Sequence, residues 1–82
     1  MKLLFFASFR EKLGVDCEDW TNLDSIATLD DVLEKLRSRG EPWQSTLAPD
    51  GTLAAINQEM APLCSSVAED DEVAFFPPVT GG

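Results

Sequence analysis

Two apolar segments of strand length lie close to the two ends of the chain. Lys2–Ala7 and Val73–Phe76 are nearly continuous hydrophobic runs, and each predicts a buried strand. Because they are the most apolar segments, we expect them side by side in the middle of a sheet. Successive side chains of a strand point to opposite faces, so both faces of these two strands are apolar. The sheet is then either covered on both faces or has one exposed apolar face.

The clearest periodic segment is Thr28–Arg39, where the spacing of apolar positions changes from two residues to a helical repeat. Thr28 is placed to cap this helix, and Asp31 stands at the third helical position in a variant of the capping box. Gly40 is expected to end it. The apolar positions, at i, i+3, i+4 and i+7, are Leu29, Val32, Leu33 and Leu36.

Shorter elements are expected between these segments. Ser8 and Glu11 match a capping box that opens a short helix ending at Gly14. One further helical turn is expected within 41–48, with Trp43 and Leu47 facing inward. The remaining predicted strands are 15–23, paired back on the first strand, then 53–56 and 59–61, with Asn57 and Gln58 forming the turn of a hairpin.

Strands before and after one main helix indicate an α+β fold, a mixed sheet with the helix on one face. With 82 residues the chain is long enough for one small domain. We expect residues 1–76 to form the globular body and 77–82 an extended flexible tail.

The tail begins where Pro77 and Pro78 end the last strand, because neither can donate a ladder hydrogen bond. Val79 and Thr80 are β-branched and favour extended backbone. The last two residues, Gly81 and Gly82, carry no side chain, so they can enter a slot too narrow for other residues and present a carboxylate there. A frayed terminus is the alternative, but a stiff Pro-Pro spacer after a buried strand favours a working tail.

Composition narrows the function classes. The net charge is −9, which argues against nucleic acid, because phosphate binding needs clustered Lys and Arg. Histidine is absent, so the commonest general base and metal ligand is missing. Cys17 and Cys64 are too far apart in sequence to suggest a metal motif, and we expect them to be buried small hydrophobes in a reducing compartment. Without a segment of membrane-spanning length or a signal peptide, a cytoplasmic protein with no membrane partner is expected.

Three stretches together closely resemble a known family. They are Leu-Phe-Phe-Ala in the first strand, Ala-Ala-Ile-Asn-Gln in the middle, and the final Asp-Glu-Val-Ala-Phe-Phe-Pro-Pro-Val-Thr-Gly-Gly. They resemble the small subunit of molybdopterin synthase, a ubiquitin-like β-grasp sulfur carrier, and the resemblance covers the whole chain. One departure is Asp70, which stands where the family usually has a glycine before the last strand. Asp tolerates the left-handed region better than most residues, so the departure concerns the turn and not the tail.

The resemblance implies a function for the chain end. A ubiquitin-activating-like adenylyltransferase would adenylate the carboxylate of Gly82 with ATP, and sulfur would replace the adenylate to give a thiocarboxylate. The tail would then enter the large synthase subunit and donate sulfur to a cyclic pyranopterin, building the dithiolene of molybdopterin. The assembly would be a heterotetramer of two small and two large subunits. The chain itself would bind no cofactor or metal and would not be catalytic alone.

Strand parity suggests where the large subunit binds. If Leu3 and Phe5 face the core, Phe6 faces away, and Phe76 does so on the last strand. Met60 matches a position that the family uses for contact with the large subunit. We therefore predict an apolar patch of Phe6, Met60 and Phe76 beside the root of the tail. Ordinary core packing is the alternative for each of these side chains.

Other functions also fit a Gly-Gly end. The chain could be a ubiquitin-like modifier joined to lysines of other proteins through Gly82, or a sulfur carrier for another pathway such as thiamine synthesis. It could also be a plain interaction domain with a disordered tail. A modifier would form conjugates of higher mass, a carrier would change mass only at its C-terminus, and an interaction domain would tolerate loss of Gly82.

Overall fold

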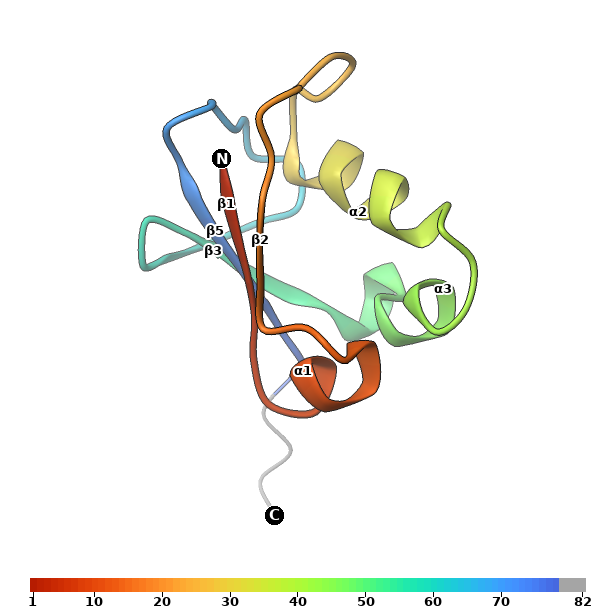
Figure 1. The fold of residues 1–82 in the computed structure, drawn as a ribbon. Coiled ribbons are helices and arrows are strands. Elements are labelled where there is room, and N and C mark those ends of the chain that lie inside the picture. The colour runs from red at the N-terminus through yellow and green to blue at the C-terminus, as the bar shows by residue number, and fades with distance from the viewer. Residues whose placement is uncertain (79–82) are drawn as a thin grey trace.

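The computed structural model describes residues 1–78, which form helices packed against one sheet (Figure 1). The helices are α1 (Ser8–Leu13), α2 (Leu29–Arg37), α3 (Trp43–Thr46) and the 3₁₀ turn η1 (Pro49–Gly51). The strands are β1 (Lys2–Phe5), β2 (Cys17–Asp19), β3 (Leu53–Ile56), β4 (Glu59–Ala61) and β5 (Glu72–Phe76). The predicted α+β class is confirmed, and every predicted strand is present, with 15–23 reduced to the three residues of β2.

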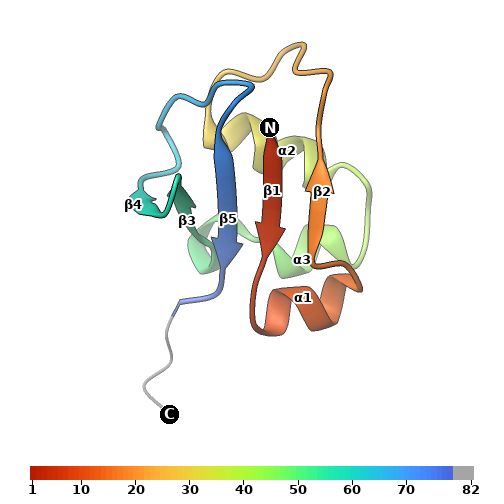
Figure 2. The same cartoon turned by 60° about the vertical axis from the view of Figure 1, so that its left-hand side comes forward.

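Within residues 1–78 the strands form a mixed five-stranded sheet in the order β2-β1-β5-β3-β4 (Figure 2). β1 and β5 run parallel in neighbouring positions, and the other pairs are antiparallel. Leu3 lies opposite Val73 and Phe5 opposite Phe75. The prediction that the two most apolar strands pair inside the sheet is therefore confirmed, although they come from opposite ends of the sequence.

The helices cover one face of the sheet (Figure 1). Alternate residues of β1 and β5 point into that layer, where α2 supplies its apolar stripe. The Phe5 and Phe75 rings stack with centroids 6.2 Å apart, and Trp43 meets Phe5 edge-on at 5.8 Å. The core side chains, each at most 4% exposed, are Leu3, Phe5, Phe9, Leu29, Val32, Leu33, Leu36, Leu47, Ala54, Val73 and Phe75.

The start of α2 has the predicted capping box. The Asp31 N–H donates to Thr28 Oγ1 at 3.3 Å, and Asp31 Oδ2 accepts from the N–H groups of Ala27 (2.8 Å) and Thr28 (3.0 Å). Those two N–H groups favour the charged carboxylate and hold the pKa of Asp31 below its ordinary value. The helix ends at Arg37, two residues before the predicted end, and Gly40 follows with a φ of 92°.

The capping box predicted for Ser8 is wrong. Ser8 is already the first residue of α1, the N-cap is Ala7, and no side chain caps the helix. β1 ends at Phe5, so only Phe6 and Ala7 separate the strand from the helix. With so short a connection, the backbone of Ala7 makes the turn itself, at φ 56° and ψ −133°. The predicted stop at Gly14 is confirmed, with a left-handed φ of 75°.

The β3–β4 turn is tied to the start of β5 through Asn57. As predicted, Asn57 and Gln58 make the hairpin turn, with φ values of 51° and 71°. Asn57 Oδ1 accepts from the Glu72 N–H at 3.0 Å, and its Nδ2 donates to Asp71 Oδ1 at 3.0 Å. Asp70 is not among the described residues with positive φ, so the missing glycine leaves no strain in this turn.

A polar cluster fastens the edge strand β2 to the helix layer. Arg39 donates to both carboxylate oxygens of Glu18, at 2.8 and 2.9 Å, and Trp20 Nε1 donates to Glu18 Oε1 at 3.0 Å. The Arg39 guanidinium also stacks over the Trp43 ring, 4.5 Å from its centroid. These bonds from Arg39 lower the pKa of Glu18. The cluster compensates for the small number of ladder bonds that a three-residue strand can make.

Replacing Thr28 with Ala should lower the free energy of unfolding by about 1 kcal/mol, because the N-cap hydroxyl that accepts from Asp31 is lost. Thr21→Ala is the control, since Thr21 is exposed in the preceding loop. Urea denaturation followed by circular dichroism measures both. Equal stability of the two variants would show that the capping box does not stabilise α2.

Candidate functional site

The sheet face opposite the helices is open and apolar near its middle. Figure 2 looks onto this face, which we call the outer face, with α2 and α3 lying behind the strands. Pairing places one residue from each strand in a row across it. From one edge to the other this row is Cys17, Leu4, Ala74, Ala55 and Met60. Small alanines at its centre leave a flat surface between larger side chains.

Large apolar side chains lie on the outer face, three of them near the end of β5 and Met60 nearer the middle of the sheet. Phe6 is 45% exposed, Leu53 36% and Met60 63%, and Phe76 is half-buried. We call these four residues the apolar patch. Large apolar side chains with such exposure, on a face that a sheet would normally cover, indicate a surface for another protein.

The patch is fixed to the root of the tail by main-chain bonds. The Phe6 N–H donates to the Phe75 carbonyl at 3.2 Å, which extends the β1–β5 ladder and sets Phe6 beside Phe76. Leu53 lies opposite Phe76 on the other side of β5. Met60 belongs to β4, two strands from β5, and is paired with Ala55. The structure thus places all three predicted contact residues on one face, with Phe6 and Phe76 adjacent and Met60 farther away.

Leu53 is a patch residue that the sequence analysis missed. The sequence pattern places Leu53 in a short strand but does not assign its side chain to either face of the sheet. The two-residue turn at Asn57–Gln58 fixes the β3–β4 register, which pairs Ala55 with Met60 and so puts Ala55 on the face predicted for Met60. The strand alternation would then have placed Leu53 and Ala55 outward. The pairing of Leu53 with Phe76 joins β3 to β5 and has no such local signal.

The tail continues from the patch. Pro77 is half-buried and Pro78 is exposed, directly after the last residue of β5. The predicted tail residues Val79, Thr80, Gly81 and Gly82 lie outside the described residues. The other end of the outer face is polar, since the register there sets Lys2 between Asp19 and Glu72.

Both cysteines are exposed, so the prediction that they are buried is wrong. Cys17, on the edge strand β2, pairs with Leu4 of β1. Paired residues point to the same face, so the Cys17 side chain points to the outer face. Cys64 lies in the loop that leads from β4 toward β5. The charge of the neighbouring Asp16 disfavours the thiolate and raises the pKa of Cys17, so this thiol is not activated as a nucleophile.

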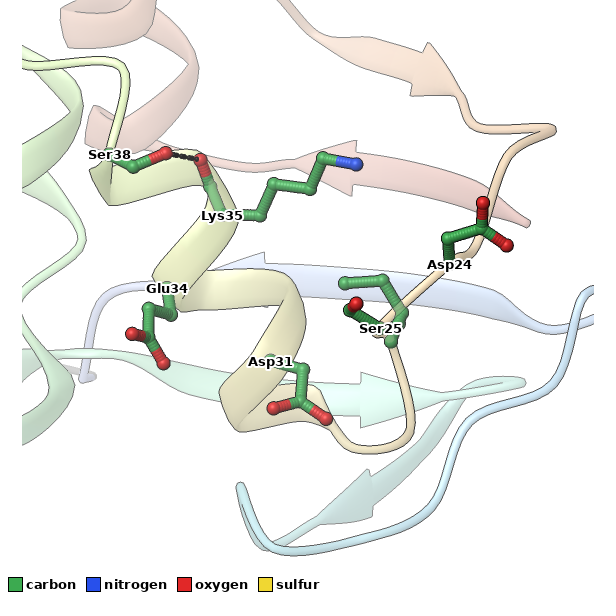
Figure 3. Close-up of a pocket in the computed structure, with 7 residues that line it drawn as sticks. Asp24, Ser25, Asp31, Glu34, Lys35 and Ser38 are labelled. Carbon is green, nitrogen blue, oxygen red and sulfur yellow. Dashed lines mark hydrogen bonds between the residues drawn. The ribbon is translucent and has the colours of Figure 1, made fainter.

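A shallow hollow on the helix side does not assemble a reactive group. Figure 3 shows it between α2 and the loop before it. Asp31, which lines it, already accepts from the N-cap backbone, and Ser38 Oγ donates to the Lys35 carbonyl at 2.6 Å. These two polar side chains are therefore already engaged in hydrogen bonds of the helix and its cap. The other lining residues are Asp24, Ser25, Ile26 and Glu34.

Residues 1–78 contain no group of three or more Cys, Asp or Glu side chains arranged to hold a metal ion. In the same part of the chain, no helix has the length and apolar character needed to cross a bilayer. The candidate site is the apolar patch on the outer face, whose exposed side chains can bind the surface of another protein.

The chain is similar to known proteins over its full length. A model described as the ThiS family matches residues 3–82. The molybdopterin synthase sulfur carrier subunit of Haemophilus influenzae is 46% identical over 82 residues, covering 100% of this chain and 99% of that protein. Small archaeal modifier protein 3 of Haloferax volcanii is 33% identical over 91 residues, covering 100% and 98%.

A solved structure supports the fold. The crystal structure of small archaeal modifier protein 1 from Haloferax volcanii superposes with a TM-score of 0.72 at 28% identity, covering 96% of this chain and 97% of that one. The ubiquitin-like β-grasp fold that the sequence resemblance implied is thereby confirmed.

Both thiols should react with a maleimide in the absence of denaturant, because both are exposed. At pH 8, replacing Asp16 with Asn should speed the alkylation of Cys17 up to several-fold, since removing the adjacent negative charge lowers the pKa of the thiol and raises the fraction of thiolate. Peptide mass mapping over time measures each site, and Cys64 in the same molecule is the control. An unchanged Cys17 rate would contradict the electrostatic account.

Proposed function

Since the chain belongs to the ThiS family and has the ubiquitin-like β-grasp fold, we propose that it is the sulfur carrier subunit of a molybdopterin synthase. The observation that carries the proposal is the 46% identity, from end to end, with the sulfur carrier subunit of Haemophilus influenzae. The Gly-Gly sequence at 81–82 and the apolar patch at the root of the tail support it.

The reacting group in this proposal is the carboxylate of Gly82. A carboxylate is a poor electrophile, so it first attacks the α-phosphate of ATP on an activating enzyme, forming an acyl adenylate and releasing pyrophosphate. A sulfur nucleophile then displaces AMP and leaves a thiocarboxylate on Gly82. The thiocarboxylate sulfur is finally transferred to a cyclic pyranopterin to build the dithiolene, and two carriers serve each product.

None of these steps requires an acid or base from this chain. The absence of histidine and of a metal-binding group in residues 1–78 is compatible with that division of labour. The chain contributes a slim end without side chains at Gly81 and Gly82, which lets partner groups close around the reacting carbon. The rate acceleration comes from the partners, through positioning and electrostatic stabilisation.

The apolar patch is the surface we propose for the large synthase subunit. It lies where β5 leads into Pro77, so a partner seated on it is positioned to receive the segment that follows. In the proposed heterotetramer, each of two small subunits docks through this patch on one large subunit. The net charge of −9 for the chain favours a partner with a basic surface.

A second function is favoured by a specific observation. The 33% identity with small archaeal modifier protein 3 and the structural similarity to modifier protein 1 are compatible with a modifier that is joined to lysines through Gly82. Both functions use an activated chain end and differ in the nucleophile that attacks it. Covalent conjugates of higher mass in cells would support the modifier, and their absence alongside sulfur transfer supports the carrier.

Adding one residue after Gly82 should abolish dithiolene formation, because the reacting carbon would then lie one residue too far along the tail. The melting temperature should not change, because the buried core is formed by residues within 3–75 and none of them is changed. Reconstituted synthesis with the large subunit, activating enzyme, ATP and a sulfur donor measures the activity. Normal turnover by the extended protein would refute the proposal.

Replacing Met60 with Ala should weaken binding to the large subunit by about tenfold, the effect typical of a contact residue at an interface. The side chain is 63% exposed, so the melting temperature should change little. Gln44→Ala is the control, because Gln44 is of similar size and exposed on α3 in the helix layer. Isothermal titration calorimetry gives both constants, and equal affinities would remove Met60 from the interface.

A further inference from the structure

The strongest local strain at the root of the tail is at Ala7. Its φ of 56° and ψ of −133° lie in a region that glycine populates readily and that a Cβ atom makes unfavourable. Three other described non-glycine residues have positive φ, and two of these, Asn57 and Gln58, form a hairpin turn that requires it. Ala7 takes the first central position of a type II′ turn over residues 6–9, closed by the Phe9 N–H to Phe6 carbonyl bond, and glycine is the residue usually found at that position.

Hydrogen bonds on both sides hold Ala7 in this conformation. The N–H of Phe6 is fixed to the Phe75 carbonyl at 3.2 Å, and the Phe6 carbonyl accepts from the Phe9 N–H at 3.1 Å. The Ala7 carbonyl accepts from the Glu11 N–H at 3.4 Å, the first bond of α1. Because Phe9 is only 4% exposed and anchors α1 in the core, the helix cannot shift to relieve the strain. The connection therefore dictates the backbone geometry at position 7, whichever residue stands there.

The methyl group of Ala7 does not stabilise the fold. Ala7 is exposed, so its Cβ buries no core surface that would offset the strain. Glycine would make the same turn without the steric conflict. Ala7 does follow Phe6, the patch residue beside the root of the tail, directly in sequence, and both side chains are exposed.

We propose that the Cβ of Ala7 is a contact point for the large synthase subunit, retained at the expense of folding stability. This inference rests on the proposed function and adds a residue to the docking surface. The strained backbone holds the methyl group rigidly next to Phe6, so that little conformational entropy is lost when the partner binds. Ala7 is thus a specificity and positioning residue and not a catalytic one.

The test is Ala7→Gly, with Ser25→Gly as the matched control. Ser25 is also exposed and has a positive φ of 68°, but it lies in the loop before α2, beside the hollow on the helix side (Figure 3). Both substitutions should raise the melting temperature by several degrees, because glycine relieves the positive-φ strain at each position. Only Ala7→Gly should weaken binding to the purified large subunit, about fourfold for one lost methyl group.

Calorimetric titration of the large subunit with the wild-type chain and both variants separates the outcomes. Weaker binding by Ala7→Gly alone, despite higher stability, supports the inference. Equal affinity of all three chains would overturn it and leave the proposed function intact, with the strain belonging only to the short connection. If the wild-type chain itself does not bind the large subunit, the proposed function falls, and the inference falls with it.

Discussion

The parallel pairing of β1 with β5 is the interaction on which the rest of this molecule depends. It joins the two most apolar segments of the chain, which are separated by almost its entire length, and buries Leu3, Phe5, Val73 and Phe75 to 1% exposure or less. The intervening chain has to cross back over the sheet to allow it, which places α2 on one face. The same pairing sets Phe6 beside the end of β5, so the root of the tail and the patch are made by one ladder.

Side chains alternate between the two faces along these strands, and the two faces have different roles. The inward residues meet the helix layer and hold the fold together, while the outward residues leave an apolar surface without a partner in residues 1–78. Exposed apolar surface is tolerated in a soluble domain when another protein covers it. Under the proposed function, that protein also receives the tail, so the body of the carrier determines where its chain end is delivered. The chemistry itself then needs no side chain of the carrier, only a reactive end of the right length.

Much of the fold could be predicted because its signals are local and strong. The stripe of α2, the Thr28–Asp31 capping box and the Asn57–Gln58 turn all follow from spacing and residue type. Strand alternation showed that Phe5 shares a face with Leu3, but not which face is inward, because both faces are apolar. The errors arose where tertiary structure overrides such signals. Ser8 looks like a cap, but only Phe6 and Ala7 separate β1 from α1, so the helix begins one residue earlier than predicted. Cys17 looks buried by residue type, but it occupies the outward side of an edge strand.

The candidate site could be predicted only in part, for a related reason. Parity within one strand identified Phe6 and Phe76, but Leu53 enters the patch through its register with a strand about 20 residues later in sequence. The strained backbone of Ala7 has no sequence signal, because alanine gives no indication of positive φ. It results from the distance between the end of β1 and the anchored start of α1, which only the assembled structure defines.

The most direct test of the account is the intact mass of the chain, purified without a C-terminal tag from cells that contain the activating enzyme. The account predicts a gain of about 16 Da, the replacement of one oxygen by sulfur, localised to Gly82 by fragmentation. An unmodified mass, persisting after incubation with the activating enzyme, ATP and a sulfur donor, would contradict it.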